Sequence, residues 1–436
     1  MNELNKKRKL DYKWFVIGAS FLMVMIALGF CSSPKSYFIG PITEHLGIDR
    51  STYSINDSIR FITTTVVSLF FGTLIRKFGV RKLIAAGFLS LVASSVCYAL
   101  AENIWVIYLG GMFLGLGLCW TTTTMVGFIV NRWAKENKGT IMGAVLAANG
   151  IGGAIAMNIV SPIIESGKTG YKNAYLVVAA VLFVAGVIVV SLMRETPKGK
   201  ENEAVEISKK KSRGKSWGGL SFSDTKKKWY FYAAVFCVFG TGFFMTSCNG
   251  VAVQHMKDVG LDPAYVTAIW SVHSLVLALF KFLTGFIYDK TGLRVTMTIC
   301  MTTAIIVVFC LALVTPTPEG KVLAVIYSVF SGLALPMETV MLPILTGDLF
   351  GQKSFDEVLG LSSAASTMGY AIASPIMNGV YDTYKTYTYG MFFCLGLMAV
   401  LIILMQFIIT SAHKTQKKVE SELAEASPAA SVETAQ

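Results

Sequence analysis

Four charged side chains lie deep inside long apolar stretches of this 436-residue chain. They are Asp57, Arg60, Lys281 and Glu338. An ionised group removed from water is costly unless it is paired or lines a water-filled cavity, so each is a candidate for a functional role. An ammonium or guanidinium group can bind an anion, and a buried carboxyl group can take up and release a proton. The chemistry these residues support is therefore ion pairing, anion binding and proton transfer.

The composition of the chain is that of a membrane protein. Hydrophobic residues make up 54% of the chain and charged residues 15%, and the mean hydropathy is +0.59. Soluble proteins carry about 25% charged residues, so this deficit points to lipid as the solvent. The net charge of +12 lies in short clusters between apolar runs, a pattern that orients membrane helices and argues against a nucleic-acid partner.

A bilayer core needs about 20 apolar residues per helix, and twelve stretches of the chain meet this length. The fold class predicted is an all-α membrane protein with twelve transmembrane helices. Most of the 38 Lys and Arg residues then fall on the side that holds both termini, which makes that side cytoplasmic. The expected location is the inner or plasma membrane. The predicted spans are 14–34, 52–76, 82–101, 104–131, 139–164, 173–193, 229–250, 263–288, 293–314, 321–347, 357–380 and 388–411.

The two halves of the chain resemble each other. GTLIRKFGVRK at 72–82 recurs as GFIYDKTGLRV at 285–295, and other paired features recur at nearly the same offset. This indicates two pseudo-symmetric six-helix bundles, the architecture of a secondary transporter with its site between the halves. The predicted parts are a cytoplasmic N-terminus (1–13), a first bundle (14–194), a Lys-rich cytoplasmic linker (195–228), a second bundle (229–412) and a disordered tail (413–436).

The repeated segment resembles the signature of the major facilitator superfamily, a glycine-led loop with basic residues. The signature usually has an acidic residue where this chain has Arg76, so the second copy is the better formed. The resemblance implies that these residues form a gating motif. They are Gly72, Gly79 and Arg81 in the first copy, and Gly285, Asp289, Gly292 and Arg294 in the second.

Within that superfamily, the chain is similar to the monocarboxylate transporter and oxalate/formate antiporter group. The similarity rests on Asp11 to Phe15, Pro34-Lys35-Ser36, Asn131-Arg132-Trp133, Asp348 to Gly351 and Gly379 to Asp382. It runs from about residue 11 to residue 412. It implies proton-coupled transport of a small organic anion by alternating access.

Lys281 is the leading substrate ligand. In the similar family an arginine at this position binds the substrate carboxylate, and a lysine can do so as a point charge. Counting residues at 1.5 Å each places Glu338 at a similar depth. We hypothesise that Glu338 neutralises Lys281 in the empty protein, and that the arriving anion frees the carboxylate to take a proton. The alternative is a fixed ion pair that holds helices together.

The remaining candidates lie nearer the outer side or on span 11. Asp57 and Arg60 are expected to form a local salt bridge, with Arg60 as a second anion ligand and Asp57 as a second proton-coupling carboxylate. Lys35 resembles the family's extracellular lysine, although an exposed snorkelling lysine is equally compatible. The oxalate antiporter has a second cation where this chain has Ser366, so a monocarboxylate is expected as substrate. Tyr370 is a further substrate-binding candidate.

The sequence lacks the motifs of several other function classes. The four histidines have no metal-ligand spacing, no Walker A sequence is present and no nucleophile with a base is visible. We therefore expect no enzyme activity, no metal, no cofactor and no ATP. Two alternatives to symport stay open, which are an anion antiporter of the oxalate/formate type and a transporter-like sensor that signals through the linker or the tail.

Overall fold

The computed structural model describes residues 12–134, 136–167, 169–194 and 218–426. Within these ranges the chain is helical and contains no strand. The linker between 195 and 217 and both chain ends lie outside them. The first half contains α1 (Tyr12–Ser32), α2 (Lys35–Leu46), α3 (Arg50–Leu69), α4 (Phe71–Phe78), α5 (Val80–Ala99), α6 (Ile104–Thr121), α7 (Thr123–Trp133), α8 (Lys138–Glu165) and α9 (Gly170–Leu192).

The second half begins with a short helix at the end of the linker and then repeats the pattern of long helices. It contains α11 (Phe222–Thr225), α12 (Trp229–Asp258), α13 (Pro263–Thr291), α14 (Leu293–Ala312), α15 (Pro318–Ala334), α16 (Pro336–Thr339), α17 (Met341–Phe350), α18 (Phe355–Tyr384) and α19 (Thr388–Ala426).

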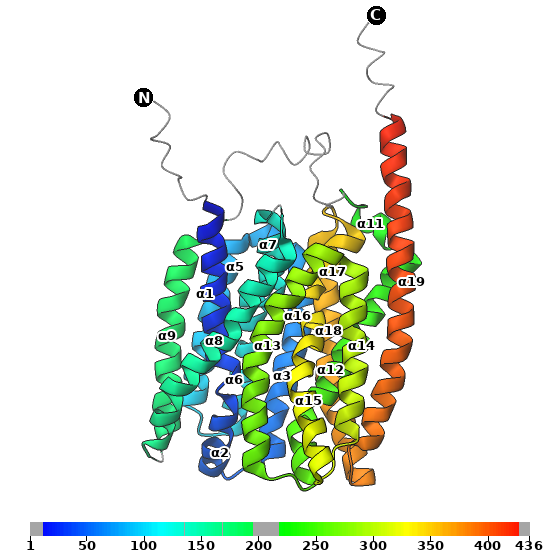
Figure 1. The fold of residues 1–436 in the computed structure, drawn as a ribbon. Coiled ribbons are helices and arrows are strands. Elements are labelled where there is room, and N and C mark those ends of the chain that lie inside the picture. The colour runs from blue at the N-terminus through cyan, green and yellow to red at the C-terminus, as the bar shows by residue number, and fades with distance from the viewer. Residues whose placement is uncertain (1–11, 135, 168, 195–217, 427–436) are drawn as a thin grey trace, which may run out of the picture.

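The helices stand side by side as a bundle whose two halves adjoin (Figure 1). The start of α1 and the ends of α9 and α19 lie on one face of the bundle, and α2 lies on the opposite face. We call these the inner and the outer face, after the orientation predicted from the basic residues.

The number of spans agrees with the sequence prediction once α18 is included. Among the described residues, 10 helices are long and apolar enough to cross a membrane, or 11 if α3 and α4, bent by 64°, form one span. Helix α18 has 30 residues, enough length to cross, but it is less apolar because it carries Ser362, Ser363 and Ser366. The fold is the predicted all-α membrane fold.

Three predicted spans are broken helices. The chain bends at Phe70 between α3 and α4, and it breaks at Thr122 between α6 and α7, where Thr121 and Thr122 donate hydrogen bonds to the carbonyls of Gly117 and Leu118. Threonines that bond back to the preceding turn favour such bends. The span expected over 321–347 breaks before Pro336, because proline has no N–H to donate to the preceding turn.

Two segments differ from the sequence expectation in extent. Helix α2 (Lys35–Leu46) lies in the connection between the first two predicted spans, for which no helix was predicted. Helix α19 continues to Ala426, although a disordered tail was predicted from 413. His413 Nε2 lies 3.4 Å from Asp348 Oδ1, which holds this extension against the second half.

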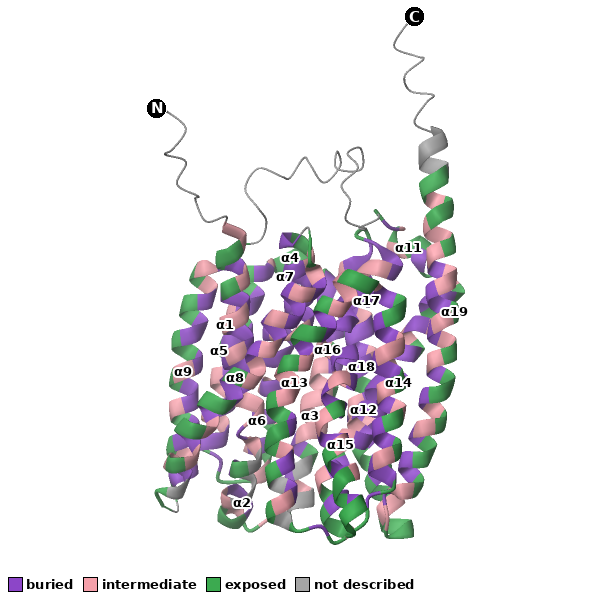
Figure 2. Ribbon diagram, viewed as in Figure 1, coloured by how far each residue is buried: buried purple, intermediate pink, exposed green. Residues whose placement is uncertain are grey.

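Many large apolar side chains are exposed on the surface of the described structure. Figure 2 shows exposed residues along α9 and α19. Apolar side chains are among them, with Val187 at 58% and Phe393 at 62% of full exposure. Water would not cover such a surface stably, whereas lipid tails would.

Two antiparallel crossings join the halves. Helices α3 and α4 run along α18, and α8 runs along α13. We call them the α3–α18 seam and the α8–α13 seam. At the second seam a Cβ on Gly285 would collide with the backbone of Gly139, so glycine is required there for the backbones to approach.

Candidate functional site

Lys281 lies at the α8–α13 seam without a counter-ion. Its residue is 5% exposed, and its backbone packs against Gly143 of α8. In the described parts of the chain, its ammonium group forms no ion pair and no hydrogen bond. Burial of an unpaired ammonium group is costly. The boundary between the two halves therefore holds an uncompensated positive charge.

Glu338 is held by hydroxyl groups. It lies in α16 and is 5% exposed. Its Oε2 accepts hydrogen bonds from Ser366 Oγ at 2.5 Å and from Tyr370 OH at 3.5 Å, and its Oε1 accepts one from Thr241. These donors come from α12 and α18, which flank the break that begins at Pro336. Among the described residues, the carboxylate of Glu338 thus has hydroxyl partners and no cation.

The hypothesised ion pair between Lys281 and Glu338 is not formed in the described structure. The two residues were placed at similar depth by residue count, but depth leaves the direction of each side chain around its helix undefined. Ser366 and Tyr370, predicted as substrate ligands, instead donate hydrogen bonds to Glu338. The structure therefore separates the buried cation from the buried carboxylate.

Lys35, Asp57 and Arg60 form a second charged group, which we call the outer cation cluster. Lys35 Nζ forms an ion pair with Asp57 Oδ2, and Arg60 Nη2 lies 3.7 Å from Asp57 Oδ1. The guanidinium carbon of Arg60 lies 4.3 Å from the centre of the Phe61 ring. With two cations and one carboxylate, the cluster has a formal charge surplus of one. The expected salt bridge between Asp57 and Arg60 is present, and Lys35 joins it because α2 brings it close.

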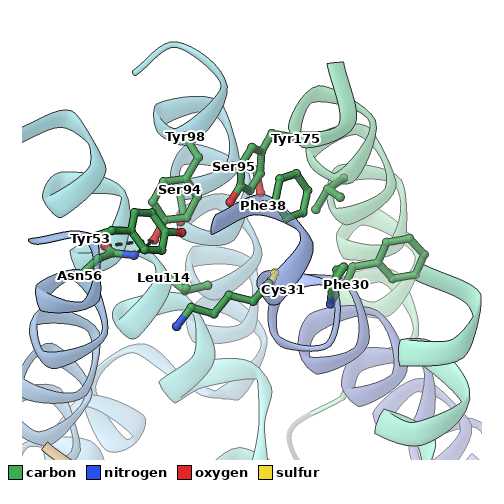
Figure 3. Close-up of a pocket in the computed structure, with 13 residues that line it drawn as sticks. Phe30, Cys31, Phe38, Tyr53, Asn56, Ser94, Ser95, Tyr98, Leu114 and Tyr175 are labelled. Atoms are coloured by element: carbon green, nitrogen blue, oxygen red, sulfur yellow. Dashed lines mark hydrogen bonds between the residues drawn. The ribbon is translucent and has the colours of Figure 1, made fainter. Parts of the chain in front are cut away.

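A pocket lies beside this cluster, inside the first half (Figure 3). It contains about 410 Å³ of space, part of it open solvent, and Lys35 is one of its lining residues. Asn56 Nδ2 donates to Tyr98 OH at 2.9 Å on one side, and the rings of Phe38 and Tyr175 stack at 3.9 Å on the other. The pocket belongs to one half alone, so it is separate from the seam that contains Lys281.

Polar contacts close the inner face between the halves. Arg76 of α4 pairs with Glu357 of α18, and Arg132 Nη2 lies 3.1 Å from Asp356 Oδ2. We call these four residues the inner latch. Among the described residues, hydrogen bonds and ion pairs join the halves on the inner side of Phe61 and Tyr370. The structure is therefore closed at the inner face.

The second copy of the motif closes the other seam in a different way. Asp289 accepts hydrogen bonds from Gly139 N at 3.0 Å, Thr140 N at 2.7 Å and Thr140 Oγ1 at 2.6 Å. These groups form the start of α8, where a carboxylate is favoured by unpaired N–H groups and the helix dipole. Helix α18 instead carries two acids of its own at its start. The motif residue facing it must be basic, which explains Arg76.

The other motif residues have mainly structural roles. Gly79 and Gly292 have φ angles of 76° and 85°, a region that favours glycine. Arg294 Nη2 donates to Thr410 Oγ1 at 2.8 Å within the second half. Gly72 packs on the backbone of α18, where an added Cβ would lie 3.0 Å from Glu357 N. Arg81 is exposed at the start of α5.

Several residues in these contacts were not identified from the sequence. Glu357 and Asp356 carried a signal, because a basic residue in place of the usual acid calls for an acidic partner elsewhere. Thr241 and Phe61 carried none, since neutral hydroxyl and aromatic residues are common in membrane helices. Their roles depend on which helix faces they occupy.

Comparisons with known proteins agree on one family. The family profile described as Major Facilitator Superfamily matches residues 14–327 and 235–434. An uncharacterised MFS-type transporter, YcxA of Bacillus subtilis, is 25% identical over 65% of this chain and 66% of its own length. Monocarboxylate transporter 12-B of Danio rerio is 23% identical over 93% of this chain and 89% of its own.

A solved structure has the same fold. The proton:xylose symporter XylE, bound to 6-bromo-6-deoxy-D-glucose, superposes with a TM-score of 0.71 at 13% identity. The match covers 91% of this chain and 96% of that one.

Reversing one charge of the inner latch should open the inner face. We expect Arg76→Glu or Glu357→Arg to raise the population of molecules whose inner face is open. The double exchange, which combines both substitutions, should restore the closed face. A half-exposed pair is worth about 0.5–1 kcal/mol, and replacing attraction by repulsion about doubles this, so the open-to-closed ratio should rise about 5–30-fold. Spin-label distances between positions 77 and 353, in a variant without native cysteines, measure it.

Lys82→Glu is the matched control, because Lys82 is exposed near the same loop and undergoes the same charge change. It should leave the distance distribution as in the parent. A double exchange that stays as open as either single variant would show that the pairing of Arg76 with Glu357 does not hold the face closed.

Proposed function

The chain belongs to the major facilitator superfamily, and we propose that it transports a small monocarboxylate together with a proton by alternating access between its halves. The observation that carries this proposal is the buried ammonium group of Lys281, which has no counter-ion in the described chain. An anion arriving there would supply the missing partner. Its carboxylate would be held between α8 and α13, the helices that must move relative to each other.

The proposed substrate has one negative charge. Lys281 offers one cation to the seam, and Ser366, the position at which the similar antiporter has a lysine, is occupied in donating to Glu338. A dianion would leave its second carboxylate unpaired in a site of low polarity, which disfavours it. Monocarboxylate transporter 12-B, by its name, belongs to a group that carries such substrates.

Charge balance supports a role for a proton. Lys281 and ionised Glu338 together carry no net charge, although they do not touch. Adding an anion leaves a net negative charge among the buried groups, and a proton on Glu338 restores neutrality. The hydroxyl groups of Ser366, Thr241 and Tyr370 can donate to the ionised carboxylate, and a hydroxyl oxygen can accept from the protonated form. Glu338 therefore has partners in both states.

The proposed cycle begins from the arrangement in which the inner face is closed. The outer cation cluster, with its surplus positive charge, attracts anions to the outer side. Neutralisation of Lys281 removes the cost of moving a bare ammonium group through the closed state, and the inner latch then opens. In this proposal the inner face is cytoplasmic and the membrane is the plasma membrane, as the basic residues predict.

Anion exchange is the second candidate, and the same observation favours it. An empty carrier would have to return with an unpaired Lys281, whereas an exchanger returns with an anion bound. Exchange needs no proton on Glu338. The pH response of uptake therefore separates the two candidates.

Removing the ammonium group of Lys281 should strongly reduce uptake. We expect Lys281→Ala to reduce lactate and pyruvate uptake into proteoliposomes about 10–100-fold, because a hydrogen bond to a charged group contributes about 1.5–3 kcal/mol. Lys281→Arg should retain part of the activity. The control is Lys290→Ala on the same helix, since Lys290 is exposed at its inner end. Uptake by Lys281→Ala within twofold of the wild type would contradict the assignment.

Replacing the buried carboxyl should uncouple uptake from pH. Wild-type uptake should rise as the external pH falls, because the proton enters with the anion. In Glu338→Gln, an imposed pH gradient should no longer drive uptake, while anion counterflow continues. Glu319→Gln, an exposed glutamate at the start of α15, should respond as the wild type does. An unchanged pH response in Glu338→Gln would make Glu338 a structural residue.

A further inference from the structure

A continuous set of contacts connects the outer cation cluster of the first half to Glu338 of the second. Arg60 is paired with Asp57, and its guanidinium carbon lies 4.3 Å from the centre of the Phe61 ring. The Phe61 ring in turn meets the Tyr370 ring edge-on, with centres 5.5 Å apart at 65°. Tyr370 OH donates to Glu338 Oε2 at 3.5 Å. Two charged sites in different halves are thus joined through two aromatic side chains.

The pair of Phe61 and Tyr370 occupies a special position. Among the described residues it is the one aromatic contact that crosses between the halves. It lies in the α3–α18 seam, one turn outward from the bond of 2.8 Å between Thr65 and Thr367. Both rings are half-buried. Any motion of one half against the other must change this contact.

We propose that Phe61 and Tyr370 act as positioning residues that couple the outer cation cluster to the protonation of Glu338. This inference rests on the proton-coupling role of Glu338 in the proposed function. An anion bound at Arg60 draws the guanidinium group off the Phe61 ring, the ring reorients, and Tyr370 OH changes its distance to Glu338. Binding of an anion at the outer side thereby changes the protonation of Glu338.

The hydrogen bond from Tyr370 is the longest that Glu338 accepts, so it is the one that a small movement changes most easily. Ser366 Oγ donates at 2.5 Å from a buried position, whereas the bond from Tyr370 is long at 3.5 Å. A hydrogen bond donated to a carboxylate stabilises its ionised form. Weakening the Tyr370 bond therefore favours the protonated form of Glu338.

The groups around each end of this connection are few. Glu338 is faced by Thr241 from α12 and by Ser366 and Tyr370 from α18, and Lys281 on α13 forms no ion pair with it. Arg60 is faced by Asp57 on its own helix, and Lys35 of α2 holds that same aspartate. Cys31 of α1, Tyr53 of α3 and Tyr98 of α5 also lie within electrostatic range of Arg60. The aromatic pair is thus the physical contact by which these groups can influence one another over a short range.

Infrared titration of the protonated carboxyl tests this without transport. The band of Glu338 is identified in purified protein as the one missing from Glu338→Gln, and its intensity is followed with pH. We expect Tyr370→Phe and Phe61→Leu each to move the midpoint to higher pH by about 0.5–1 unit. The double variant should shift no further than the larger single shift, because both changes act through one contact.

Two controls separate the contact from general perturbation. Tyr384→Phe makes the same change at an exposed position of α18, and it should leave the midpoint unchanged. Arg60→Gln should raise the midpoint in the wild-type background, but it should have no effect when Phe61 is already leucine. A direct electrostatic effect of Arg60 would persist in both backgrounds.

An unchanged midpoint in Tyr370→Phe, or additive shifts in the double variant, would overturn this inference. Failure of the proposed function gives a different result, namely no proton-dependent uptake by the wild type in proteoliposomes. The infrared midpoint does not depend on that outcome. The two conclusions can therefore fail separately.

Discussion

A buried ammonium group without a counter-ion is the feature that constrains the rest of this structure. Lys281 is 5% exposed and unpaired within the described chain, at a crossing where Gly143 lets two helix backbones touch. Such a charge destabilises the empty protein, and an anion that reaches it removes the cost. In the proposed function, the energy of anion binding and the need to reorganise the halves are therefore located at the same seam. Glu338 supplies the opposite charge at a distance, held by hydroxyl groups that suit both of its protonation states.

The two halves carry recurring sequence segments, but their inner closures use opposite charge patterns. In the second copy of the motif, Asp289 binds the N–H groups at the start of α8. In the first copy, Arg76 binds a carboxylate carried by α18 itself. Each arrangement closes one of the two seams at the inner face. Each can separate without leaving a polar group buried, because it lies at the water-facing ends of the helices. The duplicated backbone thus tolerates a reversed charge when its partner helix changes with it.

Hydropathy and spacing predicted the spans and the division into halves, because helix length and apolar content are local properties. The breaks at Thr122 and Pro336 were not predicted, although threonine back-bonding and the missing proline N–H provide their physical cause. Residue counts placed Lys281 and Glu338 at similar depth, but they carry no information about rotation around each helix axis. For that reason the residue count could not decide whether the hypothesised ion pair forms, and the described structure does not contain it. The partners of Glu338 came from two other helices, and no spacing along one helix could have identified them.

The most direct test of the central claim is ligand-induced thermal stabilisation of the purified protein. Lactate or pyruvate should raise the melting temperature of the wild type in a concentration-dependent way, since a ligand bound only by the folded state stabilises it. Lactamide, which has the same shape without the charge, should not. In Lys281→Ala the effect of the carboxylates should disappear. Equal stabilisation of Lys281→Ala and the wild type would show that the carboxylate is bound somewhere else.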